Sequence, residues 1–227
     1  MPAEPAFRQV GKGKAVKDLL TRSCDGQNAR GCGALGRARD LDVLAVPLQQ
    51  AWQAAGATAE QAAAWFDAYR PTVFFGVPTM YVRLLRLPDA VRKRHDLRSL
   101  RYVGSTGSPC APSVKAEMID WFGPVLNECY GSSELGYMTL LTSEEALRKP
   151  GSAGRALPGV ALKILDEEGR ELPVNTPGLI YIDQPNFADF SYVGNEKARA
   201  AMERGGLKTM GDVGYLDDEG FLFIVDR

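Results

Sequence analysis

The sequence of 227 residues contains very little histidine and no paired cysteines. His95 is the only histidine, and the four cysteines form neither a Cys-x-x-Cys pair nor the Cys/His spacing of a zinc site. The sequence therefore gives no sign of a zinc centre or a disulfide scaffold. We expect a reduced, cytoplasmic protein.

Long apolar runs and an excess of one charge are also missing. No apolar run reaches the roughly 20 residues of a membrane span, and the first residues do not resemble a secretory signal. The 27 Lys and Arg residues nearly balance the 28 Asp and Glu residues, which leaves a net charge of −1. We therefore expect no membrane span and no nucleic-acid partner, and any bound anion must be held by local geometry.

Residues 1–58 show little periodic apolar pattern, so we leave them unassigned and expect them to be poorly ordered. The glycines between Gly31 and Gly36 suggest a phosphate-binding loop. However, no Gly-Lys-Ser/Thr ending follows them, and no β-rich run precedes them. A loose basic tail is the favoured interpretation.

Residues 59–149 alternate between helical and strand patterns. The predicted helices and strands are 59–69 (helix), 72–77 (strand), 78–87 (helix), 100–104 (strand), 112–122 (helix) and 125–129 (strand). Such alternation predicts βα units on a mostly parallel sheet, that is, an α/β subdomain.

Residues 150–227 lack helical patterns and carry hairpin signals instead. Turn sequences at 166–169 and 217–220 separate runs of β-forming residues. We predict a smaller β-rich, barrel-like subdomain.

Two polar loops follow predicted strands, at 104–109 and 130–134. Ligands of open α/β sheets bind beyond the carboxyl ends of the strands, so both loops should line one site. The second loop offers an aromatic ring (Tyr130), hydroxyls for phosphate oxygens and a carboxylate (Glu134) able to bind Mg²⁺. For either loop alone, an ordinary turn with Glu134 capping a helix is at least as good an interpretation.

Five pieces taken together are more specific. They are Val77-Pro78-Thr79-Met80-Tyr81, Gly104 to Pro109, Tyr130-Gly131-Ser132-Ser133-Glu134, Gly151-Ser152-Ala153-Gly154-Arg155, and Gly211 to Tyr215 leading to Asp226-Arg227. In order and spacing they resemble the superfamily of AMP-forming acyl-CoA synthetases, luciferases and peptide-synthetase adenylation domains. The resemblance covers residues 59–227 and implies part of the N-terminal domain of an adenylate-forming enzyme, ending at the hinge to its C-terminal domain.

The resemblance also implies roles for individual residues. Tyr130 would stack on adenine beside Glu128, and Ser133 and Glu134 would act in catalysis, with Glu134 as the Mg²⁺ ligand. Asp212 and Arg227 would bind the ribose. The implied nucleotide-binding set is Gly104, Ser105, Thr106, Gly107, Ser108, Glu128, Tyr130, Gly131, Ser132, Ser133, Asp212 and Arg227.

The implied reaction joins a carboxylic acid to coenzyme A by way of ATP, with AMP as a product. The acyl pocket would include Phe75, Gly76, Tyr81 and Cys129, and Cys129 stands where the family often has glycine, so a narrower pocket is expected. Weak similarities favour a fatty-acyl or a bile-acid/aryl type of ligase.

Some family parts are not found in these residues. No Ser/Thr/Gly-rich loop ending in Pro-Lys-Gly occurs in residues 1–58, and the family's C-terminal lysine domain is not among these 227 residues. We therefore expect a truncated ligase with little activity on its own and a tendency to self-associate through uncovered surface. A non-catalytic nucleotide-binding or interaction module and an unstable product of a broken gene are the alternatives.

Overall fold

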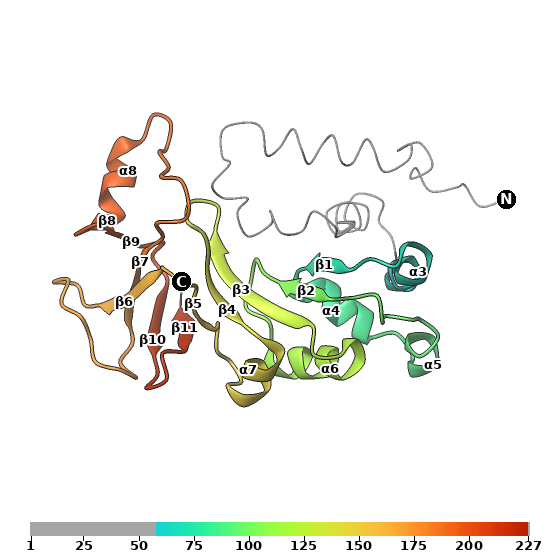
Figure 1. Cartoon of the computed structure of the whole chain (residues 1–227). Helices are drawn as coiled ribbons and strands as arrows, with labels where there is room; N and C mark the ends of the chain where they lie inside the picture. Colours follow the sequence, from blue (N-terminus) through green and yellow to red (C-terminus); the bar gives the residue numbers. More distant parts are fainter. Residues whose placement is uncertain (1–57, 227) are drawn as a thin grey trace. The chain divides into compact units, whose positions relative to one another are not determined.

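The computed structural model describes residues 58–226 (Figure 1). The expectations for residues 1–57 and for Arg227 lie outside these described residues. In the described part, no helix is long and apolar enough to cross a membrane.

The first sheet has five strands in the order β1-β2-β3-β4-β5. They are β1 (Val73–Gly76), β2 (Tyr102–Ser105), β3 (Leu126–Ser132), β4 (Gly136–Leu141) and β5 (Arg155–Ala156). β1, β2 and β3 pair in parallel, whereas β3–β4 and β4–β5 pair antiparallel. The predicted α/β fold with a sheet that contains parallel strands is thus confirmed, although β4 and β5 were not predicted.

Helices precede or connect the strands of this sheet. They are α3 (Ala59–Tyr69), α4 (Pro78–Leu85), α5 (Asp89–Arg92), α6 (Pro112–Phe122) and α7 (Ser143–Arg148). Thr58 and Gln61 form a capping box at the start of α3, and proline occupies the first turn of α4 and of α6. These local signals explain why the starts of α3, α4 and α6 were predictable to within about a residue, whereas α5 and α7 were not predicted.

One face of the first sheet is packed against helices. The Phe66 ring of α3 meets Phe74 of β1 edge-on at 5.3 Å between centroids, and it meets Phe122 of α6 at 5.6 Å. Each of these phenylalanines is nearly or fully buried, and burial of such a side chain contributes roughly 1.5–3 kcal/mol. This aromatic contact fixes α3 and α6 against the sheet.

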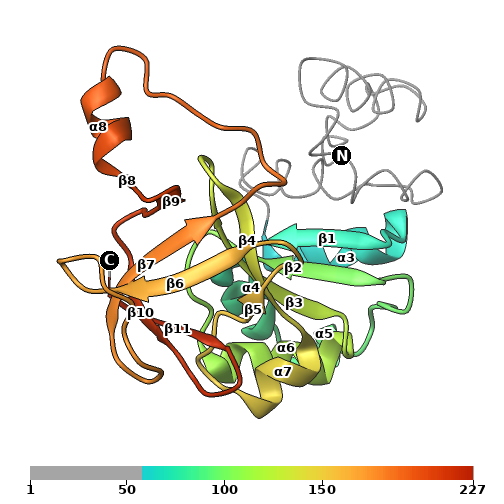
Figure 2. The same ribbon diagram turned by 60° about the vertical axis from the view of Figure 1, so that its left-hand side comes forward.

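The second sheet is antiparallel and open (Figure 2). Its strands are β6 (Ala161–Leu165), β7 (Gly178–Asp183), β8 (Glu203–Arg204), β9 (Leu207–Lys208), β10 (Val213–Leu216) and β11 (Leu222–Asp226). β7 pairs with β6 along one edge and with β9 and β10 along the other.

The expectation of a barrel-like subdomain was wrong. Within residues 58–226, β6 does not pair with β8 or β11, so the second sheet does not close. The expectation that helices end near residue 150 was also wrong, because α8 (Glu196–Ala201) follows β7. Six residues are too short for a periodic apolar pattern, and Asn195 caps this helix by accepting from Ala198 N–H.

Backbone hydrogen bonds join the segment before β5 to the start of β11. Ala153 N–H donates to Leu222 O at 2.8 Å, and Leu222 N–H donates to Gly154 O at 2.9 Å. Gly154 has φ of 92°, and a Cβ placed on it would lie 2.2 Å from Leu140 O. Only glycine fits this point, where β4 and the segment joined to β11 approach each other.

We predict that Gly154→Ala destabilises the fold more than Gly151→Ala does. Both glycines have a positive φ, but a Cβ on Gly151 would meet no atom within 4 Å. Gly151→Ala should therefore cost about 1 kcal/mol for backbone strain, and Gly154→Ala about 1–3 kcal/mol more for the clash. Urea unfolding followed by circular dichroism measures both, and equal losses would contradict the steric argument.

Candidate active site

The two predicted loop segments lie at the carboxyl ends of β2 and β3, two neighbouring strands of the first sheet. Since β1, β2 and β3 are parallel, their carboxyl ends share one edge. Thr106, after β2, donates its backbone N–H to Gly76 O at the end of β1. The residues Gly104 to Ser108 therefore occupy the end of β2 and the start of the loop that follows it.

The second predicted loop is largely strand. Tyr130, Gly131 and Ser132 belong to β3, which continues beyond the end of β2 and forms a hairpin with β4. A register shift between Tyr130 and Gly131 bends this extension. Ser133 and Glu134 lie in the turn, and Ser132 Oγ accepts from Leu135 N–H at 3.1 Å.

Glu128 is buried in an ion pair. Its Oε2 contacts the Lys115 ammonium of α6, and its Oε1 accepts from Cys110 N–H at 2.9 Å. Lys115, 2% exposed, also donates to Ser152 O at 3.3 Å. Glu128 thus supports the loop after β2 from within the protein.

Lys115 was missed by the sequence analysis although its position carried a signal. The buried residues of α6 are Lys115, Met118, Ile119 and Phe122, which is the i, i+3, i+4, i+7 spacing of a core-facing stripe. A lysine on such a stripe needs a buried acidic partner.

Tyr130 and Asp212 meet although 82 positions separate them. The Tyr130 hydroxyl donates to Asp212 Oδ2 at 2.6 Å, and Asp212 is 4% exposed. Asp212 directly precedes β10, so this bond joins the β3–β4 hairpin to the second sheet. Two residues predicted from separate motifs therefore lie side by side.

Glu134 has a partner that the sequence did not reveal. The Tyr192 hydroxyl donates to Glu134 Oε1 at 3.0 Å. Glu134 is partly buried, and Ser133, next to it, is exposed. A carboxylate and a hydroxyl are hard oxygen ligands, so this pair of residues suits Mg²⁺ chemically.

The four expected acyl-pocket residues are divided between the two faces of the first sheet. Gly76 and the fully buried Tyr81 lie on the helix-covered face, where the Tyr81 hydroxyl donates to Gly104 O at 2.6 Å. Phe75 and Cys129 lie on the opposite face with Tyr102, which packs on Phe75 and contacts Cys129 Sγ at 3.4 Å. The four side chains therefore do not line one wall.

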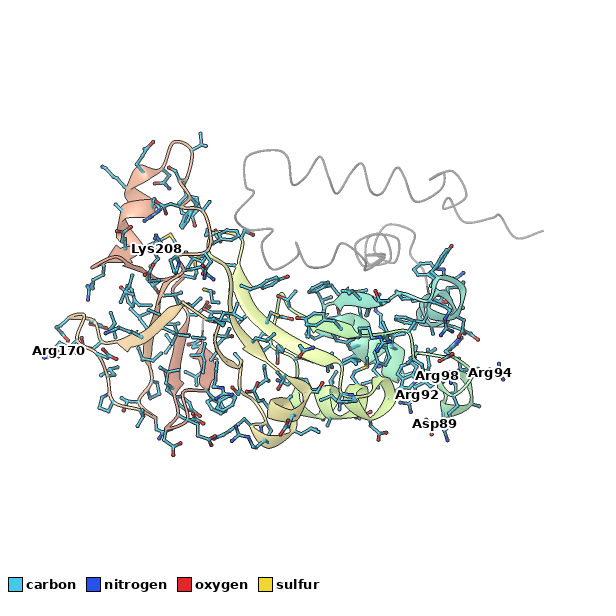
Figure 3. All side chains as sticks on the ribbon, in the orientation of Figure 1. Asp89, Arg92, Arg94, Arg98, Arg170 and Lys208 are labelled. Atoms are coloured by element: carbon cyan, nitrogen blue, oxygen red, sulfur yellow. The ribbon has the colours of Figure 1, made fainter. Side chains whose placement is uncertain are left out.

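A basic segment lies at the other edge of the sheet. Residues 83–101 hold seven Arg or Lys and two Asp, and Arg92, Arg94 and Arg98 gather around α5 (Figure 3). Arg98 pairs with Asp96 at 2.8 Å. The part of this stretch around α5 leads into the amino end of β2, whereas the candidate site is at the carboxyl end, so Arg92, Arg94 and Arg98 are not part of it.

Comparison with known proteins identifies the family. The model of the family described as "AMP-binding enzyme" matches residues 50–190. The chain belongs to this family of AMP-binding enzymes. Among its relatives, 4-coumarate–CoA ligase-like 3 of Arabidopsis thaliana is 31% identical over 71% of this chain and 30% of its own length. The long-chain-fatty-acid–CoA ligase of Bacillus subtilis is 34% identical over 71% of this chain and 28% of its own.

Solved structures also match this chain. An amide bond synthetase from Marinactinospora thermotolerans has a TM-score of 0.70 and 29% identity, covering 75% of this chain and 35% of that one. O-succinylbenzoate coenzyme A synthetase from Bacillus subtilis in complex with AMP has a TM-score of 0.64 and 28% identity, covering 75% and 34%. The chain thus spans about a third of the length of these relatives.

We predict that Lys115→Met strongly destabilises the AMP-binding fold. Removing the ammonium leaves the Glu128 carboxylate buried without its counter-charge, which costs about 3–5 kcal/mol. Lys163→Met is the matched control, because Lys163 makes an exposed pair with Glu171 at 2.7 Å and should change stability by less than about 1 kcal/mol. Chemical denaturation measures both; similar losses would contradict the assigned role of the buried pair.

We also predict that Cys110 resists alkylation. Burial raises the pKa of the Cys110 thiol to about 11, and the nearby Glu128 charge adds to this effect. Roughly 0.1% of the thiol is then ionised at pH 8, so modification by iodoacetamide should rise about tenfold per pH unit from pH 8 to 10. Peptide mass mapping follows this site. Rapid labelling of the folded protein at pH 7 would refute the prediction.

Proposed function

We propose that this chain provides the nucleotide-binding part of an AMP-forming acid–thiol ligase. In the proposed reaction, a carboxylate oxygen attacks the α-phosphorus of ATP, the bond to pyrophosphate breaks, and acyl-AMP forms. The thiol of coenzyme A then loses its proton and its sulfur attacks the acyl carbon, which releases AMP. The names of the relatives, several of which are CoA ligases, support this reaction class.

The hydrogen bond between Tyr130 and Asp212 is the observation that carries the proposal. It joins an aromatic ring to an ionisable carboxylate at the carboxyl edge of the sheet. Such a pair can present a flat face to adenine and an acceptor to the ribose hydroxyls. The small residues Gly104 to Ser108, at the end of the neighbouring strand β2 and in the loop after it, would let a ring approach the backbone. Arg227, the proposed second ribose contact, lies outside the described residues.

The turn between β3 and β4 supplies the proposed catalytic groups. Ser133 would donate its hydroxyl to a phosphate oxygen, and Glu134 would hold Mg²⁺. When bound there, the ion would neutralise charge on the phosphates of ATP. Ser132 Oγ already accepts from Leu135 N–H at 3.1 Å, so it shapes the turn.

The acid substrate is proposed to be a fatty, bile-acid-like or aryl acid. Of the expected pocket residues, Phe75 and Cys129 lie on the face of the sheet not packed against α3 and α6, with Tyr102 between them. This face can contact an apolar acyl group. Tyr81 would act from the opposite side by fixing Gly104 O.

Asp212→Asn is expected to weaken AMP binding by about 10-fold or more. The ribose hydroxyls would then donate to a neutral amide oxygen instead of the Asp212 carboxylate. A hydrogen bond to a charged group contributes about 1.5–3 kcal/mol. Asparagine keeps an oxygen for Tyr130, so the fold should survive. Calorimetric titration with AMP measures the loss, and Asp183→Asn at the end of β7 is the control. Equal affinity for wild type and Asp212→Asn would refute the proposed site.

An assay of carboxylate-dependent exchange of pyrophosphate into ATP distinguishes a ligase from a non-catalytic binding module. We propose that a polypeptide of these 227 residues binds AMP with little exchange activity, because the family's Pro-Lys-Gly loop is not among them. Exchange above that of a Glu134→Ala variant would contradict the proposed low activity. AMP binding without exchange, even in a longer polypeptide with the missing family parts restored, would favour the non-catalytic module.

A further inference from the structure

The segment 189–199 is organised around a single arginine. Arg199 of α8 is only 13% exposed, and its guanidinium pairs with Asp189 at 2.9 Å and with Glu203 at 2.8 Å. Its Nε donates to Phe190 O at 3.1 Å, and its Cζ lies 4.8 Å from the centre of the Phe190 ring. One side chain therefore holds the backbone and the ring of Phe190.

The Phe190 ring in turn orients Tyr192. The two rings meet edge-on, with 5.4 Å between their centroids and an angle of 71°. A ring held in this way loses little further freedom when its hydroxyl forms a hydrogen bond. The Tyr192 hydroxyl uses this position to donate to Glu134 Oε1 at 3.0 Å.

The hydrogen bond from Tyr192 to Oε1 constrains the Glu134 carboxylate. The hydrogen bond limits the rotation of the Glu134 side chain, and it occupies Oε1 rather than Oε2. A carboxylate held in one orientation is better prepared to bind a divalent cation. Hydrogen-bond partners of metal ligands commonly affect metal affinity 10–100-fold.

We propose that Tyr192 is a positioning residue that prepares Glu134 to bind the divalent cation of the nucleotide complex. The inference rests on the proposed function, because it takes the Glu134 carboxylate as the metal ligand. Tyr192 acts through Glu134 and does not itself contact the cation. Arg199 and Phe190 act one step further away, by holding Tyr192 in place.

Mn²⁺ binding and AMP binding, measured on the same protein, test this role. The probes are Mn²⁺ with ATP, followed by electron paramagnetic resonance of free Mn²⁺, and AMP alone in buffer with a chelator. Tyr192→Phe keeps the ring against Phe190 and removes only the hydroxyl. It should weaken Mn²⁺ binding to the ATP complex about 10-fold and leave AMP affinity and the melting temperature unchanged.

Two further variants separate positioning from a general structural effect. Tyr215→Phe is the matched control, because Tyr215 stacks on Phe223 within the second sheet and phenylalanine keeps that stack. In a Glu134→Gln background, Tyr192→Phe should have no further effect on Mn²⁺ binding, since the two residues act as a unit.

The outcomes are distinguishable. Wild-type Mn²⁺ affinity in Tyr192→Phe, or an undiminished effect of this change in the Glu134→Gln background, would overturn the positioning role while leaving the nucleotide site intact. Parallel losses of AMP affinity and Mn²⁺ affinity would assign Tyr192 to the fold instead, which also overturns it. A wild-type chain that binds neither AMP nor Mn²⁺–ATP would overturn the proposed function and this inference together.

Discussion

The buried pair of Lys115 and Glu128 constrains most of what surrounds the candidate site. Two charges removed from water are tolerable only when each finds partners, because the desolvation cost is several kcal/mol per ion. Lys115 reaches Glu128 and Ser152 O, and Glu128 also accepts from Cys110 N–H. Helix α6, strand β3, the loop after β2 and the segment before β5 must therefore keep one arrangement.

This constraint extends to the second sheet through short polar contacts. Ser152, whose carbonyl receives Lys115, donates its hydroxyl to Leu222 O at 2.9 Å at the start of β11. From β3, the Tyr130 hydroxyl reaches Asp212 before β10. The first sheet is thus linked to the second at β10 and at β11, which are neighbouring antiparallel strands. The Asp212 carboxylate, proposed as the ribose acceptor, can therefore be held at a fixed distance from the Tyr130 ring.

The sequence predicted the parts of the fold that have strong local signals. The capping box at Thr58, the prolines at Pro78 and Pro112 and the turn at 217–220 placed helices and strands within a few residues. The extension of β3 through Tyr130 was missed because its glycine and serines favour turns, whereas pairing with β4 holds them in a strand. The expectation of a barrel was wrong because a barrel closes only when the outermost strands of the sheet pair with each other. The alternation of apolar and polar residues within one strand does not specify which strands pair.

The site was predictable to the extent that its residues lie in motifs. Tyr130, Glu134 and Asp212 were named from motifs, and the structure places Tyr130 against Asp212. Tyr192 and Lys115 were not named, since each acts through a partner far away in the sequence, at a separation of 58 and 13 positions. The division of Phe75 and Tyr81 between opposite faces was likewise hidden, because it depends on where β1 ends and α4 begins.

The two polar contacts of the candidate site differ in how firmly they are held. Asp212 is 4% exposed, so its bond to Tyr130 is shielded from competing water. Tyr192 lies in a segment whose helix, α8, has no buried residue, and Arg199 is the main side chain that secures it. Regions with few buried contacts open at lower free energy than the core. The bond between Tyr130 and Asp212 should therefore persist when the segment 189–199 opens, whereas the bond that orients Glu134 is lost. Under the proposed function, local opening would weaken cation binding before it affects nucleoside binding.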